Sequence, residues 1–275
     1  MDMEKIGLIA GNGRFPIIFA EKAREQGLSV VAVAHRGETQ PELEKEISAS
    51  GGQIHWIHVG QLSRMIRIFK SAGVEQVIMA GGIKKTRLFS NLRPDLRSLR
   101  LLRQVGQKKD DLLLRAVAQE LESEGLKVRE STLYLSSILA TKGPMTRRVP
   151  TPGKWQDIRF GWEIAKEIGR LEIGQCIVVK QRVVLAVEAI EGTDETIRRG
   201  GRLCRSGAVV IKVSKPHQDL RFDVPAIGPS TIETMMEVNA ATLALEAGKT
   251  LLLDKEVVLE KANQAGISIV GMESL

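Results

Sequence analysis

The fold is decided by the stretch KIGLIAGNGRFPIIFAEKAREQGLSVVAVA, residues 5–34. A short apolar run over residues 5–10 precedes a glycine-containing turn, an amphipathic segment over 17–26 and a second apolar run over 28–34. Short apolar runs bounded by turns are typical of buried strands, and Gly27 after the amphipathic segment is a common helix end. The order strand, helix, strand predicts a βαβ unit with parallel strands.

The same alternation continues through the first half of the chain. It predicts strands over 53–59 and 74–82, and helices over 62–72, 93–105 and 110–125. Strands that alternate with helices form a parallel sheet with the helices packed on its faces. We therefore expect a Rossmann-like N-terminal domain over residues 1–140, which is an ordinary size for a domain.

The second half of the chain begins after a segment without periodicity. Residues 141–157 carry three prolines and two glycines, which indicates an interdomain linker. Helical and strand patterns then alternate again, so we expect a second domain over residues 158–275. Its elements are an amphipathic helix after Asp157, two strands that meet at the turn 180–182, a helix over 195–203, strands over 208–213, 250–254 and 267–271, and helices over 232–247 and 256–265. The predicted fold class is α/β, with an N-terminal Rossmann-like parallel sheet domain and a C-terminal mixed α/β domain joined by a Pro/Gly linker.

Composition narrows the class of protein. The chain has 275 residues, 43% of them hydrophobic, and these suffice for a sizeable core. No apolar run reaches the roughly 18 residues of a membrane span, and the start MDMEKIGLIAGNG lacks the features of a signal peptide, so we expect a cytoplasmic protein. The formal net charge of +7 indicates an anionic partner, which could be nucleic acid, a phosphate compound or a membrane surface.

The first candidate site is the turn GNGRFP, residues 11–16, after the first strand. Glycines there let a phosphate approach backbone N–H groups at the start of a helix. As a dinucleotide fingerprint the turn is incomplete, because Pro16 replaces the third glycine and residues 34–36 contain no acid for a ribose. Contact with a phosphate or ribose, a plain tight turn and an NAD site all remain open. The substrate-binding candidates here are Gly11, Asn12, Gly13 and Gly82, which ends a neighbouring strand.

The second candidate site is AVEAIEGTDE, residues 186–195. Glu188 interrupts an apolar strand, where an ionised carboxylate is costly unless it is paired or bound to a metal. Glu191, Thr193 and Asp194 follow around a turn that can cap the next helix. The alternative is purely structural: a helix cap, with Glu188 as the partner of a salt bridge.

The third candidate site is KPHQDLRFDVPAIGPST, residues 215–231. Its basic side chains suit phosphate oxygens, and Asp223 offers a hard oxygen ligand or a general base. A solvated loop could hold the same charges without a function. Bases for phosphates and acids for a divalent cation are nevertheless what phosphoryl chemistry requires. The candidate substrate contacts are Lys212, Lys215, Gln218 and Arg221.

Five motifs together resemble a known enzyme family. They are GNGRFP, GQCIVV at 174–179, AVEAIEGTDE, KPHQDLRFDVPAIGPST and LEAGKTLLLD at 245–254, and they resemble the UDP-2,3-diacylglucosamine pyrophosphatases of the LpxI type, from lipid A biosynthesis. The resemblance implies a hydrolase that splits UDP-2,3-diacylglucosamine into UMP and 2,3-diacylglucosamine 1-phosphate (lipid X), using Mg²⁺ or another divalent cation. It also implies a cytoplasmic homodimer that works transiently at the inner-membrane surface.

The resemblance assigns roles to individual residues. It makes the C-terminal domain the catalytic one and Asp223, in Arg221-Phe222-Asp223-Val224-Pro225, the candidate catalytic group. Asp194 and Glu191 fall on its EGTD motif and are the further catalytic candidates. The expected metal ligands are Asp223, Asp194 and Glu188.

Two other classes of protein compete with this interpretation. An NAD(P)-dependent oxidoreductase would explain the first βαβ unit, but it gives the acidic segment and Asp223 no task. A non-enzymatic nucleic-acid-binding protein would explain the positive charge. With one tyrosine, three tryptophans and six phenylalanines, however, the chain has few side chains on which bases could stack, so we expect no nucleic-acid partner.

The helical pattern over residues 92–105 has two possible meanings. Arg93, Arg97 and Arg100 recur at helical spacing beside Leu92, Leu96 and Leu99. An interfacial helix at a membrane surface has this composition. An ordinary surface helix with its leucines in the core has it as well, and the sequence favours that second meaning.

Overall fold

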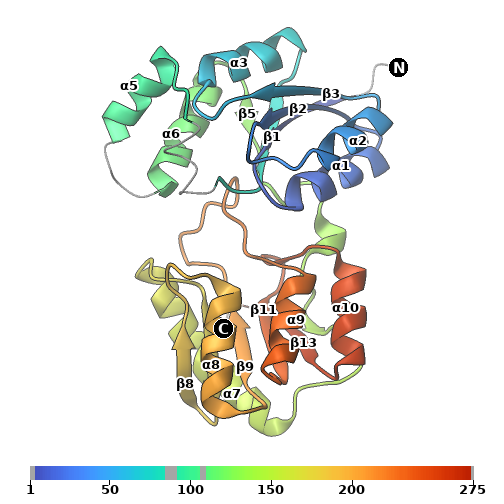
Figure 1. The fold of residues 1–275 in the computed structure, drawn as a ribbon, viewed down its shortest axis with the longest axis vertical. Helices are drawn as coiled ribbons and strands as arrows, with labels where there is room; N and C mark the ends of the chain where they lie inside the picture. Colours follow the sequence, from blue (N-terminus) through green and yellow to red (C-terminus); the bar gives the residue numbers. More distant parts are fainter. Residues whose placement is uncertain (1–3, 84–91, 106–109, 274–275) are drawn as a thin grey trace. The chain divides into compact units, whose positions relative to one another are not determined.

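The structure is a computed structural model that describes residues 4–83, 92–105 and 110–273 (Figure 1). It divides into two compact units. Unit 1 comprises residues 1–135 together with Leu220–Phe222, and unit 2 comprises residues 136–219 and 223–275. Each unit has its own sheet, flanked by its own helices.

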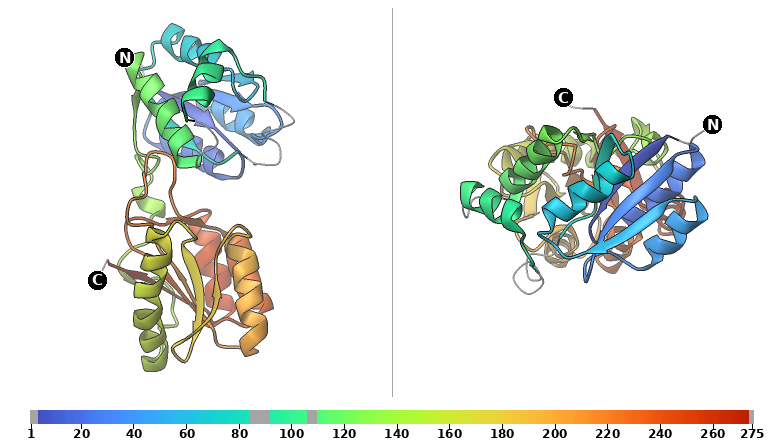
Figure 2. Two further views of the ribbon diagram at one scale, coloured as in Figure 1. Left: turned by 90° about the vertical axis from the view of Figure 1, so that its left-hand side faces the viewer. Right: turned by 90° about the horizontal axis from the view of Figure 1, so that it is seen from above.

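Unit 1 contains a five-stranded parallel sheet in the order β3-β2-β1-β4-β5. Its strands are β1 (Lys5–Ala10), β2 (Ser29–His35), β3 (Gln53–Ile57), β4 (Gln76–Ala80) and β5 (Lys127–Val128). Its helices are α1 (Phe15–Glu25), α2 (Glu42–Ala49), α3 (Leu62–Ser71), α5 (Leu96–Val105) and α6 (Asp110–Ser123). Helices α1 and α2 pack on one face, and α3, α5 and α6 on the other (Figures 1 and 2). The predicted Rossmann-like domain is confirmed, although the sequence analysis missed α2.

Unit 2 contains a six-stranded mixed sheet in the order β6-β13-β11-β9-β7-β8. Strands β9, β11 and β13 run parallel, whereas β7 runs antiparallel to both β8 and β9. The strands are β6 (Gly143–Pro144), β7 (Cys176–Lys180), β8 (Val183–Val187), β9 (Val209–Lys212), β11 (Thr242–Glu246) and β13 (Ser268–Met272), with β10 (Ala226–Ile227) and β12 (Leu251–Leu252) paired separately. The mixed α/β class predicted for the second half is confirmed.

Four helices cover the two faces of the unit 2 sheet. They are α7 (Pro152–Arg170), α8 (Thr193–Cys204), α9 (Pro229–Glu237) and α10 (Lys255–Gln264). Helix α7 packs Trp162 into one core layer, while α8, α9 and α10 build the other layer. A β-carbon on Gly161 of α7 would lie 2.3 Å from the side chain of Ile211, so glycine is what lets this helix approach the sheet so closely.

The predicted helix over 232–247 is wrong. Helix α9 ends at Glu237, Asn239 follows with a φ of +51°, and residues 242–246 form the central strand β11. All five residues of β11 are buried between β9 and β13, with Leu243 and Leu245 in one core layer and Ala244 in the other. Burial on both faces makes this short run a strand, although its residues are acceptable in a helix.

The segment predicted as a linker, residues 141–157, lies within unit 2. Gly143 and Pro144 pair with β13, and α7 begins at Pro152. The prolines and glycines of this segment therefore belong to a short edge strand and to the first turn of a helix. The chain crosses between the units after residues 135, 219 and 222.

The short segment Leu220–Phe222 is an integral part of unit 1. Ser131, which is buried, donates its backbone N–H to the carbonyl of Leu220 over 2.9 Å, and its hydroxyl lies 2.7 Å from the carbonyl of Arg221. Phe222 packs against the core layer formed by α3, α6 and the sheet. Residues far along the sequence thus complete the N-terminal core.

Among the described residues, no helix has the length and apolar character that crossing a bilayer requires.

Candidate functional site

The carboxyl ends of the parallel strands gather polar residues in each unit, and ligands of open α/β sheets bind at this edge. In unit 1 the edge is formed by the turns after β1 and β4. The N–H of Gly11 donates to the carbonyl of Ala80 over 2.8 Å, and that of Asn12 to the carbonyl of Gly82 over 2.7 Å. A β-carbon on Gly11 would lie 2.3 Å from the Gly82 carbonyl oxygen, so only glycine allows the two turns to meet.

The turn leaves open space in front of α1. Gly13 has a φ of +79° and no atom within 4 Å of the position that a β-carbon would take. Helix α1 begins just beyond, and no side chain caps its first turn. The positive end of the helix and the exposed backbone together suit an anion. The predicted contacts Gly11, Asn12, Gly13 and Gly82 therefore lie side by side.

A buried acid that the sequence analysis missed stands next to this turn. The side-chain amide of Asn12 donates to Glu38 over 3.2 Å. Glu38 follows the end of β2 by three residues, just beyond residues 34–36, which contain no acid for a ribose. The hydroxyl of Thr39 donates to the carbonyl of Ala10 over 2.7 Å and holds this turn against β1.

The corresponding edge of unit 2 collects charged residues from three strands. Glu188 follows β8, Lys212 ends β9 and Glu246 ends β11. Because β7 runs antiparallel to β8 and β9, its first residues lie at this same edge. The second and third candidate sequences therefore meet in space.

Glu188, Thr193 and Lys212 form one hydrogen-bonded chain, in which the two charged side chains are buried and Thr193 is half-buried. Lys212 Nζ donates to Thr193 Oγ1 over 2.9 Å and to the carbonyl of Ala226 over 2.8 Å. Thr193 Oγ1 donates to Glu188 Oε1 over 2.7 Å, and the N–H of Gln175 donates to Glu188 Oε2 over 3.0 Å. Buried charges that are paired in this way hold each other in fixed positions.

Asp194 and Glu191 occupy the start of α8. Asp194 Oδ1 accepts a hydrogen bond of 3.2 Å from the hydroxyl of Thr231, in the first turn of α9. Glu191 lies 2.6 Å from the guanidinium of Arg199. A backbone N–H and Arg199 lower the pKa of the Glu191 carboxyl, which therefore stays ionised.

Asp223 lies beside Lys215 and is more exposed than the predicted metal ligand Glu188. Lys215 Nζ is 4.0 Å from Asp223 Oδ2 and 3.3 Å from Glu172 Oε2. One third of the Asp223 side chain is exposed, at 33%. Asp223 can reach a bound molecule, whereas the buried Glu188 is committed to Thr193.

The start of the 215–231 loop is fixed by Gln218 within the loop and by Glu246 on β11. Gln218 Oε1 accepts hydrogen bonds from the Lys215 N–H over 2.8 Å and from the Ser214 hydroxyl over 3.0 Å. Glu246, only 1% exposed, accepts from the Ser214 N–H and from Lys166 Nζ, each over 2.8 Å. Glu246 ends β11, within the residues for which the sequence predicts a helix, and the sequence gives it no role at the site.

Arg221 lies in a different unit from Asp223, although the two are close in sequence. Its guanidinium is 3.2 Å from Glu122 Oε1 on α6 and 5.7 Å from the centre of the Phe222 ring. The unit boundary thus falls inside the RFDVP motif, after Phe222.

The predicted metal ligands do not form a ready-made cage. Within the described ranges, no group of three or more histidine, cysteine or acidic side chains is arranged to hold a metal ion. Mg²⁺, however, is commonly bound by one or two carboxylates together with phosphate oxygens and waters. Asp223 and Asp194 fit that requirement, and Glu188, which is bound to Thr193, does not.

Comparison with known proteins covers almost the whole chain. Residues 5–138 match the model of the LpxI N-terminal domain, and residues 141–270 match that of the LpxI C-terminal domain. The chain is 33% identical over 282 aligned positions to the UDP-2,3-diacylglucosamine pyrophosphatase LpxI of Caulobacter vibrioides, covering 98% of each sequence.

Similarity to solved structures is weak. The biotin carboxylase domain of 2-oxoglutarate carboxylase from Hydrogenobacter thermophilus aligns with 65% of this chain and 35% of its own, at 13% identity and a TM-score of 0.26. The biotin carboxylase subunit of pyruvate carboxylase aligns at 11% identity and a TM-score of 0.25, covering 68% of this chain and 35% of its own. The chain spans about a third of these proteins, and scores this low support no comparison of fold or function.

Proposed function

The chain belongs to the LpxI family, and on that premise we propose that it hydrolyses the pyrophosphate bond of UDP-2,3-diacylglucosamine in lipid A biosynthesis. The products would be UMP and 2,3-diacylglucosamine 1-phosphate (lipid X). The observation that carries the proposal is the match of both domains, together with a relative named for this activity that is similar over its full length.

In the proposed reaction Asp223 is the base or metal ligand nearest to the chemistry. Water attacks one phosphorus of the diphosphate, the bridging P–O bond breaks, and the proton of the water passes to Asp223 or a group beside it. Lys215, 4.0 Å from Asp223, neutralises phosphate charge. A bound Mg²⁺ would supply further charge neutralisation at the phosphate oxygens, with Asp223 and Asp194 as its ligands from the protein.

The buried groups of unit 2 position this machinery. Lys212, Thr193 and Glu188 hold the start of α8 against β9, and therefore hold Asp194 in place. Lys212 also binds the Ala226 carbonyl, three residues after Asp223. We propose that Lys212, Thr193 and Glu188 fix the position of Asp194 in addition to contributing charge to the site.

We propose that the glycine edge of unit 1 binds the nucleotide part of the substrate. The backbone of Gly11 to Gly13 and the open start of α1 suit a phosphate. Glu38, held by Asn12, suits a ribose hydroxyl, the role that an acid near the end of the second strand has in nucleotide-binding sheets.

Gly13→Ala should weaken binding of UMP by about tenfold, since a side chain at a φ of +79° displaces the turn and costs it a charge-assisted hydrogen bond. Gly27→Ala is the matched control. Gly27 has a φ of +73° and equally open surroundings, but it precedes β2 at the opposite edge of the sheet. Isothermal titration with UMP measures the effect. Equal losses in both variants would contradict a role of Gly13 in binding.

The direct test is incubation of the pure protein with UDP-2,3-diacylglucosamine and Mg²⁺, followed by mass spectrometry. We expect UMP and lipid X in equal amounts. An intact substrate, combined with a shift of nicotinamide fluorescence on mixing, would favour the oxidoreductase instead. Salt-dependent retention of RNA without hydrolysis would favour a nucleic-acid-binding protein.

We further propose that the enzyme works at the cytosolic face of the inner membrane as a homodimer. The acyl chains of the proposed substrate and the net charge of +7 support an encounter with an anionic membrane. The dimer rests on the resemblance to the family, and sedimentation analysis tests it.

A further inference from the structure

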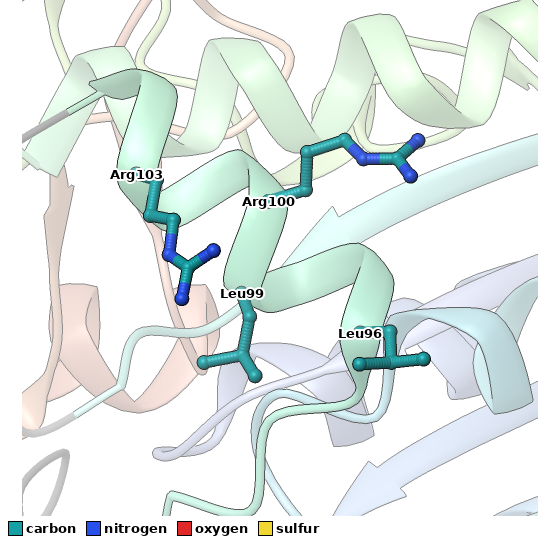
Figure 3. A pocket seen from close by; sticks show the side chains of 4 residues that line it. All are labelled: Leu96, Leu99, Arg100 and Arg103. Atoms are coloured by element: carbon teal, nitrogen blue, oxygen red, sulfur yellow. The ribbon is translucent and has the colours of Figure 1, made fainter.

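Helix α5 presents an apolar and basic face to solvent. Leu96 is 85% exposed and Leu99 is 38% exposed. With Arg100 and Arg103 they line a surface pocket of about 440 Å³ (Figure 3). The four residues lie at i, i+3, i+4 and i+7, so they share one side of the helix. Two of the three leucines that the sequence favoured for the core, Leu96 and Leu99, are therefore on the surface, whereas Leu92 is half-buried.

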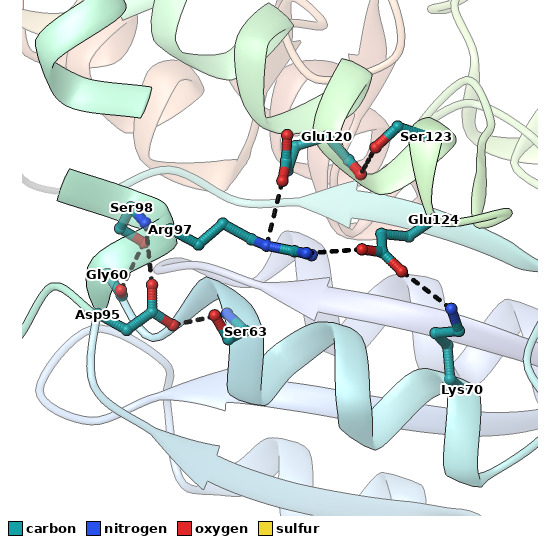
Figure 4. A network of polar contacts seen from close by, with 9 residues as sticks. All are labelled: Gly60, Ser63, Lys70, Asp95, Arg97, Ser98, Glu120, Ser123 and Glu124. Carbon is teal, nitrogen blue, oxygen red and sulfur yellow. Dashed lines mark hydrogen bonds and ion pairs between the residues drawn. The ribbon is translucent and has the colours of Figure 1, made fainter. Parts of the chain in front are cut away.

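The opposite side of α5 is firmly attached to the rest of unit 1. Leu101 is buried in the core layer with α3 and α6. Arg97 lies 3.2 Å from Glu120 and 2.7 Å from Glu124, and Lys70 of α3 pairs with Glu124 over 2.9 Å (Figure 4). Three helices are thus joined by one network of charges.

The first turn of α5 is fixed as well. Asp95 accepts hydrogen bonds from the N–H of Ser63 over 2.6 Å and from the N–H of Ser98 over 2.9 Å, and the Ser98 hydroxyl donates to the Gly60 carbonyl over 2.6 Å (Figure 4). Burial raises the pKa of the Asp95 carboxyl, but the hydrogen bonds from these N–H groups lower it by more. The pKa is therefore lowered overall, and the carboxyl stays charged. The outward direction of Leu96 and Leu99 follows from this anchoring on both sides.

A single exposed leucine does not indicate a binding surface, because much of any protein surface is apolar. Here two leucines one turn apart line the same pocket as Arg100 and Arg103, and Arg93 just before the helix is exposed too. Arg97, on the opposite side of α5, pairs with Glu120 and Glu124. Apolar side chains flanked by cations match a surface with anionic headgroups above hydrocarbon.

We propose that this face of α5, formed by Leu96, Leu99, Arg100 and Arg103, docks on an anionic lipid bilayer. The leucines enter the boundary between headgroups and acyl chains, and the arginines contact lipid phosphates. The inference gives the proposed enzyme a specific membrane-contact surface. It stands on the geometry of α5, and its test needs no hydrolysis.

The test is flotation of the full chain with vesicles, in the absence of substrate. Wild-type protein should float with phosphatidylglycerol-containing vesicles, and much less with pure phosphatidylcholine or in high salt. Arg100→Gln with Arg103→Gln should weaken partitioning by about 25-fold, because each arginine near an anionic surface contributes about fivefold. Leu96→Ser with Leu99→Ser should weaken it to a similar degree, by removing the inserted apolar area.

The matched control is Arg202→Gln with Leu203→Ser on α8. Leu203 is 67% exposed and adjoins an exposed arginine, but lies in unit 2. The control should partition like the wild type, and all variants should keep their circular dichroism spectra. Failure of the wild type to bind anionic vesicles, or equal binding by wild type and both α5 variants, would overturn the proposal.

A second copy of the chain is the rival occupant of this face. If the α5 variants change the sedimentation coefficient and leave vesicle binding intact, the face is a dimer contact and the proposal is wrong. Hydrolysis assays separate this inference from the proposed function. The α5 variants should release UMP normally from substrate in detergent micelles, and more slowly from substrate in vesicles.

Discussion

Asp223→Asn is expected to lower kcat by at least about a hundredfold, with little change in substrate binding. The amide keeps the shape of the side chain but can neither accept the proton of the attacking water nor bind a cation strongly. The main chain at Asp223 is held by the hydrogen bond of its N–H to the Asp219 carbonyl, over 3.0 Å, and Pro225 restricts the following residue. The substitution therefore removes charge without moving the loop. Single-turnover kinetics and circular dichroism measure the two effects separately.

Glu172→Gln provides the matched control. Glu172 is the other carboxylate that pairs with Lys215, over 3.3 Å, so this variant removes a neighbour of the lysine but leaves Asp223 in place. It should keep kcat within a fewfold of the wild type, because exposed ion pairs contribute little. A folded Asp223→Asn variant with near wild-type kcat would exclude Asp223 from the mechanism, and Glu191 and Asp194 would become the next candidates.

Removal of divalent cations is expected to reduce hydrolysis by roughly a thousandfold, since a metal ion stabilises the charge of a phosphoryl transition state by several kcal/mol. The structure gives a reason beyond the acidity of the motifs. Asp194 accepts a hydrogen bond of 3.2 Å from Thr231, Asp223 lies 4.0 Å from Lys215, and both carboxylates would face a substrate that brings two negative phosphates.

The measurement is UMP release after treatment with a chelator and gel filtration, before and after addition of Mg²⁺. Chelator already saturated with Mg²⁺ is the control for effects of the chelator itself. Activity should return on addition of the cation, and the protein should remain folded throughout. Undiminished turnover in the metal-free sample would contradict the prediction and leave the lysines as the source of charge neutralisation.

Local signals in the sequence were sufficient for most of the fold. Gly27 and Gly73 end their helices with φ values of +73° and +71°, and the apolar runs on either side of them are strands of the parallel sheet. Residues 242–246 were misassigned because leucine, alanine and glutamate favour a helix. Their position between β9 and β13 depends on contacts far along the chain, which no local pattern contains.

The candidate site was predictable as segments but not as contacts. The motifs identified Glu188, Thr193 and Lys212, whereas their mutual pairing depends on β7 running antiparallel to its two neighbours. Glu38 lies outside the quoted motifs, and Glu246 stands in LEAGKTLLLD without an assigned role, because the burial of each acid is set by distant residues. Tertiary packing also decided the direction of α5, since leucines and arginines at helical spacing are compatible with either side.

The place of Leu220–Phe222 in unit 1 has a consequence for biosynthesis. Ser131 and the core next to Phe222 cannot reach their final state while the ribosome is still adding residues 136–219. At translation rates of about 5–20 residues per second, the N-terminal unit waits on the order of 10 s for its last piece. Because Phe222 packs against this core, unit 1 cannot complete its packing before most of unit 2 has been synthesised.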